Sequence, residues 1–279
     1  MSDKKHKTQS IKRARTTGTI VRWVIAVILI AFAVFPVIWI ISASINPIST
    51  LATQKLIPAN PSLANFRALS GNPIFPYFTW LWNSVKVSVI STILTLSLTT
   101  MAAFAFSRFR FKGRQGILKA ILLIQVFPNL LAIVALFAIV SQMGNIVPAI
   151  GLNTHAGLIM VYLGGSMGMN IWLMKGYMDT IPRDIDESAH VDGATDWQVF
   201  TKLIIPLLRP ILVVIGILLT KGELQTVMVG LQIFTAGQYT QNWGVFAAGA
   251  LIAALPIMII YLVLQDQIVG GLTQGAVKG

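Results

Sequence analysis

The stretch Trp23–Ile45, WVIAVILIAFAVFPVIWIISASI, contains 23 residues and no charged side chain. A helix of about 20 apolar residues is long enough to cross the hydrocarbon core of a bilayer. The whole chain agrees with this, because 55% of its 279 residues are hydrophobic and only 11% are charged, against roughly 45–50% and about 25% in soluble domains. A soluble chain of this length would need more polar surface, so the sequence predicts an integral membrane protein.

Four further apolar runs have a similar length: Ser84–Phe106, Ile117–Val140, Ala156–Met174 and Val245–Leu264. A sixth run, fifth in chain order, starts at Pro210 but is interrupted by Lys221, Gly222, Glu223 and Gln225 before Val227–Phe234. Each charge at mid-membrane costs on the order of 2.5 to 3.5 kcal/mol on insertion scales. Either the charges pair or face a cavity and the run still spans, or this helix stops short.

Lysine and arginine flank the runs unevenly, which predicts an orientation. One side holds Lys4, Lys5, Lys7, Lys12, Arg13, Arg15, Arg22, Arg108, Arg110, Lys112, Arg114, Lys119, Lys175, Arg183, Lys202 and Arg209. The other side holds Lys55, Arg67 and Lys221, with Lys86 just inside the second run. If all six runs span, the positive-inside rule puts both termini in the cytoplasm of a multi-pass cell-membrane protein.

These boundaries divide the chain into a cytoplasmic basic tail (1–22), a first transmembrane helix (23–45), an external loop (46–83), a transmembrane core (84–264) that includes a cytoplasmic loop (175–209), and a cytoplasmic C-terminal tail (265–279). A basic tail can bind nucleic acid or anionic lipid. Because this tail lies directly before a membrane span, the orientation of that span explains its positive charge. We therefore expect contact with membrane lipid and none with nucleic acid.

Several kinds of site are excluded by composition. The chain has no cysteine and three scattered histidines, His6, His155 and His190, so we expect no metal site. No G-x-x-x-x-G-K-[ST] motif occurs, so we expect no ATP site on this chain. No group of residues suggests catalysis.

Six of the nine acidic residues lie in the single loop 175–209: Asp179, Asp184, Asp186, Glu187, Asp192 and Asp196. Pro182 fits the first turn of a helix, and carboxylates just after it favour the positive end of the helix dipole. Gly193 breaks that helix, and Thr195 with Gln198 forms a capping-box pattern that starts a second one. The loop therefore reads as helix, turn, helix with an acidic docking surface.

In the second helix, Trp197, Phe200 and Ile204 form an apolar stripe, and the helix is expected to end at Pro206.

The same loop carries a family motif. Glu187-Ser188-Ala189, three residues, Gly193, nine residues and Leu203-Ile204-Ile205-Pro206 resemble the EAA loop, E-A-A-x3-G-x9-I-x-L-P, of permease subunits in bacterial ABC importers. Other stretches resemble the smaller permease of the binding-protein-dependent carbohydrate (maltose/maltodextrin-type) family: Trp80–Val87, Ala103–Phe111, Gly151–His155, Lys175–Tyr177, Asp192–Thr195 and Gly271–Gly279. The resemblance covers nearly the whole chain.

This resemblance implies an all-α polytopic protein with the six-helix type I permease fold, here with a fifth span that looks shortened. It also implies a sugar or oligosaccharide importer in which the EAA loop sits in a cleft of the ATPase. The partners would be a second permease, two copies of the ATPase, which would carry the ATP, and an extracellular or periplasmic sugar-binding protein. The coupling residues carried over are Glu187, Ser188, Ala189, Asp192, Gly193, Leu203 and Pro206.

Polar residues at membrane depth form a second candidate site. Gln125 and Asn129 lie at i and i+4 in the third run, on one face, and Pro128 beside them frees a backbone carbonyl. Two interpretations stay open, which are hydrogen bonding between helices around a proline kink and contact with the sugar on its path. The helix that starts at His155 is expected to have a cap formed by the residues before it.

The external segment Thr235–Trp243 joins the last two runs. In the resembled permeases the corresponding loop reaches into the binding protein, which implies that role for Gln238, Tyr239 and Gln241. The alternative is a plain connecting loop with Trp243 anchored at the interface.

Two other functions are alternatives to a transporting permease. The shortened fifth run suits a non-transporting or truncated assembly subunit. An ion-coupled secondary transporter would need carboxylates inside the membrane, for which only Glu223 is a candidate.

Overall fold

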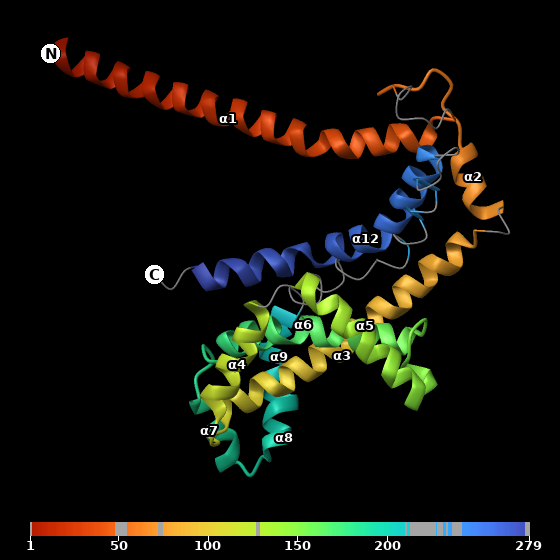
Figure 1. The fold of residues 1–279 in the computed structure, drawn as a ribbon. Helices are drawn as coiled ribbons and strands as arrows, with labels where there is room; N and C mark the ends of the chain where they lie inside the picture. The colour runs from red at the N-terminus through yellow and green to blue at the C-terminus, as the bar shows by residue number, and fades with distance from the viewer. Residues whose placement is uncertain are drawn as a thin grey trace. The chain divides into compact units, whose positions relative to one another are not determined.

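The computed structural model describes residues 2–47, 55–71, 75–126, 129–209, 211–212, 227, 231–232, 234–235 and 242–276 (Figure 1). The long helices are α1 (Ser2–Ile45), α3 (Tyr77–Arg108), α4 (Arg114–Val126), α5 (Asn129–Ile146), α6 (His155–Met178) and α12 (Trp243–Ala276). The short ones are α2 (Ala64–Gly71), α7 (Asp184–Val191), α8 (Asp196–Gln198) and α9 (Ile205–Leu207). These described residues contain no β-strand.

Four helical segments are long and apolar enough to cross a membrane. They are Gly18–Ile45 of α1, Tyr77–Arg108, His155–Met178 and Trp243–Asp266 of α12. Each contains one of the apolar runs, so the prediction of helix is confirmed for these four. Helices α1 and α3 begin earlier than the apolar runs, at Ser2 and Tyr77, because polar residues continue a helix readily once it leaves the hydrocarbon.

The third apolar run, Ile117–Val140, is helical where it is described, in α4 up to Val126 and in α5 from Asn129. Residues 127–128 and the side chain of Asn129 lie outside the described residues, so a shared face of Gln125 and Asn129 stays a prediction.

Residues 78–229 and 253–279 form one compact unit. In it, α4 packs on α6, where Trp172 Nε1 donates a hydrogen bond to the Leu118 carbonyl oxygen at 3.1 Å. A Cβ at Gly168 would overlap the Gln125 amide. Gly168 of α6 therefore lies beside the Gln125 side chain, and both interpretations of Gln125 stay predictions.

One face of α3 is lined with hydroxyl side chains that sequence reasoning missed. Ser84, Ser88, Ser91, Thr95 and Thr99 are at most 3% exposed. Thr99 Oγ1 donates to the Thr95 carbonyl oxygen at 2.6 Å, and Thr95 Oγ1 lies 3.4 Å from Ser166 Oγ of α6. Their spacing of three and four residues is the signal that would have found them, since hydroxyl groups in lipid need such partners.

Residues 1–77 and 230–252 form the other compact unit. Asn65 of α2 is buried and donates through Nδ2 to the carbonyl oxygens of Ser44 at 3.0 Å and Asn46 at 2.8 Å. The Tyr77 hydroxyl, also buried, donates to the Gly249 carbonyl oxygen of α12 at 2.6 Å. Helix α2 is thereby held on the end of α1, and the start of α3 is held on α12.

The fifth run lies mostly outside the described residues. Near its start, Ile211 and Leu212 pack on the apolar cluster that includes Ala103 and Leu208. Further along, the Val227 N–H donates to Ser84 Oγ of α3 at 2.9 Å.

Candidate functional site

The acidic loop, residues 175–209, has the predicted helix, turn, helix form, and α7 and α8 lie on either side of its tip (Figure 1). The capping box is confirmed, because the Gln198 N–H donates to Thr195 Oγ1 at 3.3 Å and the Thr195 N–H donates to Gln198 Oε1 at 2.9 Å. Gly193 has a φ of +84°, a left-handed conformation that favours glycine. Helix α7 begins at Asp184, so Pro182 precedes it and does not form its first turn.

The second helix differs from the prediction in two respects. It contains a π-helical segment, Val199–Ile204, in which the Ile205 N–H donates to the Phe200 carbonyl oxygen. The helical hydrogen bonds continue beyond Pro206 to Leu208 and Leu212. Helix α9 includes Pro206 at its start, where a missing N–H is tolerated, and for that reason the helix does not end there.

The π turn also changes which residues face inward. Phe200 and Ile204 are buried as predicted, but Trp197 is 61% exposed and Val199 takes an inward position. A π turn places residues five apart on one face, which breaks the α-helical spacing that the predicted stripe assumed.

An apolar cluster seats the acidic loop on α3 and α6. Its buried members are Ala103, Phe104, Met174, Met178, Ile181, Val199, Phe200, Ile204 and Leu208. The rings of Phe104 and Phe200 have centroids 5.0 Å apart. Ala189 and Leu203 pack against this cluster, so these two motif positions face the chain's own core.

A polar network fastens the same loop to the last two residues of α3. Arg108 Nε lies 2.6 Å from Asp186 Oδ2, and both side chains are nearly buried, with 7% and 11% exposed. Arg108 Nη2 donates to the Ile181 carbonyl oxygen at 3.3 Å. Ser107 Oγ donates to Asp179 Oδ1 at 2.7 Å, and Arg183 Nη2 donates to the Ser107 carbonyl oxygen at 2.8 Å.

The two aspartates of this network titrate in opposite directions. Burial raises the pKa of Asp186 above its ordinary value, although the nearby charge of Arg108 acts to lower it. Burial also acts to raise the pKa of Asp179, but hydrogen bonds from Lys175 and Ser107 and the charges of Lys175 and Arg114 outweigh it, so this pKa is lowered. Asp179 therefore stabilises the fold above its unfolded pKa, and this contribution is lost as pH falls through the lowered value.

The tip of the loop is exposed. Glu187, Ser188, Asp192 and Gly193 are exposed there, as is Pro206 further along. Two apolar side chains join them, Val191 at 88% exposed and Trp197 at 61% exposed. Large exposed apolar groups beside carboxylates are typical of a protein interface, and the sequence offered no signal for Val191 because it lies at the end of a short polar helix.

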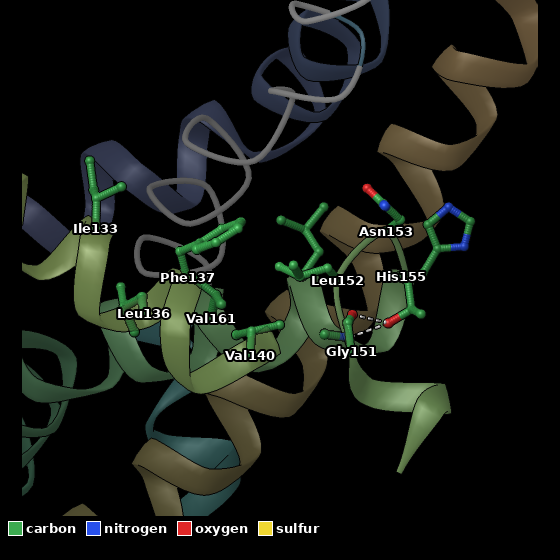
Figure 2. A pocket seen from close by; sticks show the side chains of 12 residues that line it. Ile133, Leu136, Phe137, Val140, Gly151, Leu152, Asn153, His155 and Val161 are labelled. Carbon is green, nitrogen blue, oxygen red and sulfur yellow. Dashed lines mark hydrogen bonds between the residues drawn. The ribbon is translucent and has the colours of Figure 1, made fainter. Parts of the chain in front are cut away.

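The other candidate residues lie elsewhere. Gln238, Tyr239 and Gln241 lie outside the described residues. Thr154 caps α6 as expected, since its Oγ1 accepts from the Gly157 N–H at 3.0 Å. Figure 2 shows a pocket of about 520 Å³ beside this cap, lined mainly by apolar side chains of α5 and α6, with Asn153 and His155 at one end. That lining offers few hydrogen-bonding groups to a sugar.

Comparisons with known proteins agree with the architecture. The profile of the family described as binding-protein-dependent transport system inner membrane component matches residues 95–273. The maltose/maltodextrin transport system permease protein MalG of Vibrio vulnificus (strain YJ016) is 42% identical over 278 residues, covering 90% of this chain and 92% of the relative. The MalG protein of Escherichia coli (strain K12) is 40% identical over 276 residues, with the same coverage.

Solved structures show the same fold. A chain of a bacterial ABC transporter involved in the import of the acidic polysaccharide alginate matches with a TM-score of 0.75 at 22% identity, covering 92% of this chain and 98% of that one. A chain of the alginate ABC transporter in complex with an alginate pentasaccharide-bound periplasmic protein matches with a TM-score of 0.56 at 18% identity, covering 86% and 92%. The predicted type I permease fold is confirmed.

The turn at Gly193 generates a testable prediction. Gly193→Ala forces a residue with a Cβ into the left-handed region, at a cost of roughly 1–2 kcal/mol. Hydrogen–deuterium exchange should therefore speed up at the Gly193 and Ala194 N–H groups, which donate to His190 and Ala189. Gly176→Ala is the control, because no atom lies within 4 Å of its added Cβ. Equal exchange in both variants would contradict the role assigned to Gly193.

Proposed function

Because the chain belongs to the family of binding-protein-dependent transport system inner membrane components, we propose that it is a permease subunit of an ATP-driven importer of sugars or oligosaccharides. The names of its relatives refer to maltose and maltodextrin, and similar folds serve alginate import. Carbohydrate is thus the substrate class that the comparisons favour. The chain is a multi-pass membrane protein and forms half of the translocation path.

The main support for this function is that the acidic loop has one buried side and one exposed side. Its inner side is seated on α3 and α6 by an apolar cluster and a buried ion pair. Its outer side presents Glu187, Val191 and Trp197 to solvent. A segment fixed on one side and exposed on the other is suited to receive a partner and to transmit that partner's movement.

The partner of this surface is a cytoplasmic ATPase, present in two copies. Glu187, Ser188, Asp192 and Gly193 form the contact, while Ala189 and Leu203 hold the loop close to the membrane helices. ATP is bound and hydrolysed on the ATPase, so this chain itself is not an enzyme. A second permease completes the path, and an external sugar-binding protein delivers the substrate.

Both termini are cytoplasmic in this proposal. The uneven distribution of lysine and arginine around the apolar runs supports this orientation. The acidic loop then lies on the same side as the basic residues that follow α3.

The external segment that contains Gln238, Tyr239 and Gln241 is proposed to contact the binding protein. Tyrosine stacks on sugar faces and glutamine amides donate and accept hydrogen bonds. The resemblance to carbohydrate permeases supports this role.

Reversing the charge at Glu187 tests the docking function. Glu187→Lys places a cation where the ATPase is expected to meet a carboxylate, so sugar uptake should fall at least tenfold while membrane insertion stays normal. Glu187→Gln should lower uptake less. Asp266→Lys, an exposed carboxylate of α12, is the control and should leave uptake unchanged. Normal uptake and normal ATPase stimulation in Glu187→Lys would sink the assignment.

The location of the C-terminus tests the topology. A reporter fused after Gly279 is expected to lie in the cytoplasm, because six crossings return the chain to the side on which it began. A reporter that works only in the cytoplasm should therefore be active, and one that works only outside should be inactive. A pair of reporters, one active in the cytoplasm and one outside, measures this directly. External activity at Gly279 would mean that the fifth run does not cross.

The external segment is tested by the double variant Tyr239→Ala/Gln241→Ala. Uptake that depends on the binding protein should slow several-fold, because stacking and amide contacts are lost, while ATP binding by the ATPase stays unchanged. Trp243→Phe keeps an aromatic ring at the interface and is the control. Wild-type uptake by the double variant would leave the segment as a plain connector.

A further inference from the structure

The final two residues of α3 hold the acidic loop at four points. Ser107 binds Asp179 through its hydroxyl and Arg183 through its carbonyl oxygen, and Arg108 binds Ile181 and lies against Asp186. We name this set of contacts the α3 joint. Its loop residues come both from the segment that directly follows α6 and from α7.

We propose that the α3 joint, with Arg108 and Asp186 as positioning residues, carries the movement of the docked loop into the membrane through α3. This inference rests on the proposed function. It adds to that function the contacts through which docking would move α3. Helix α3 and the loop are separated by more than 60 residues of chain, so the contacts of the joint link them.

The geometry distinguishes the joint from ordinary packing. An apolar cluster keeps two elements in contact but lets them slide, because dispersion contacts have little directionality. The joint adds two directed hydrogen bonds, from Ser107 Oγ to Asp179 at 2.7 Å and from Arg183 to the Ser107 carbonyl oxygen at 2.8 Å, and the close ion pair of Arg108 with Asp186. Together they hold the start of α7 and the segment before it against the end of α3. A rotation of α7 therefore turns the end of α3 with it.

The same residues also tie α6 to α3. Lys175 of α6 lies 2.5 Å from Asp179 Oδ2, while Ser107 binds the other oxygen of that carboxylate. Asp179 thus bridges the ends of both helices at the point where the loop begins. The hydroxyl contact between Thr95 and Ser166 connects α3 and α6 again further along. The two helices are therefore expected to move as one piece.

A cavity of about 230 Å³ lies beside the joint, between the end of α3 and the two loop helices, and Arg108, Asp186, Glu187 and Asp196 are among its lining residues. Asp186 Oδ1 has no hydrogen-bond partner among the described residues. The carboxylate therefore reaches α3 through Oδ2 and Arg108.

The test uses the complete transporter, purified with its ATPase and reconstituted with sugar-loaded binding protein. The double variant Arg108→Met/Asp186→Leu replaces the buried pair by apolar side chains of similar size, which leaves no unpaired buried charge. The complex should keep wild-type ATPase stoichiometry and basal ATP hydrolysis. Uptake per ATP hydrolysed should fall at least tenfold, and stimulation by the binding protein should be lost.

Two further variants separate positioning from packing. Arg108→Lys keeps the cation but has a single nitrogen in place of the three of the guanidinium, so it cannot reproduce both the Asp186 contact and the hydrogen bond to the Ile181 carbonyl oxygen. Its uptake should lie between wild type and the double variant. Arg110→Met is the matched control, because Arg110 is exposed and forms no ion pair among the described residues. Its uptake per ATP should equal that of wild type.

Three outcomes would contradict the proposed role of the joint. The first is normal uptake per ATP in the double variant, and the second is failure of that variant to assemble, which would make the pair a folding element. The third is an Arg108→Lys variant with no more uptake than the double variant. A wild-type chain that neither binds the ATPase nor transports sugar would instead contradict the proposed function. The two failures are thereby distinguishable.

Discussion

A buried contact between Arg108 and Asp186 holds the acidic loop on the end of α3, and the proposed coupling of the loop to the membrane depends on it. Taking both charges out of water is costly, and removing one partner of such a pair typically destabilises a protein by about 3–5 kcal/mol. Here the cost is offset by further contacts, because Arg108 also binds the Ile181 carbonyl oxygen and Arg183 binds the otherwise orphaned carbonyl oxygen of Ser107. Cations at a helix C-terminus are favoured by its dipole as well.

The membrane imposes the second constraint, since backbone and hydroxyl groups there have no water to bind. Helix α3 meets it along part of its face of serine and threonine residues, where Ser84 and Thr99 donate to carbonyl oxygens of their own helix. Ser88 Oγ and Ser91 Oγ have no hydrogen-bond partner among the described residues. Thr95 lies close to Ser166 of α6, and Ser84 accepts a hydrogen bond from the backbone of Val227. The helix that receives the loop at one end thus also contacts Val227 of the interrupted fifth run. This makes α3 the central element of its unit.

The membrane helices and the form of the acidic loop could be predicted because their signals are local. The length of the apolar runs was enough to predict four helices. The capping box Thr195–Gln198 and the glycine at 193 were enough to predict the helix, turn, helix form of the loop. The Arg108–Asp186 pair could not be predicted, because its partners are 78 residues apart and no spacing rule links them. The exposure of Trp197 could not be predicted from α-helical spacing, because a π turn changes the helical face.

The central claim is that the acidic loop and α3 move as one body. It is tested most directly by the distance between spin labels at Asp184→Cys of α7 and Leu94→Cys of α3, introduced into a chain that has no native cysteine. Both positions are exposed. Pulsed electron resonance on the reconstituted transporter should give the same distance with and without ATP in the wild-type background. A distance that changes when ATP binds would contradict the account.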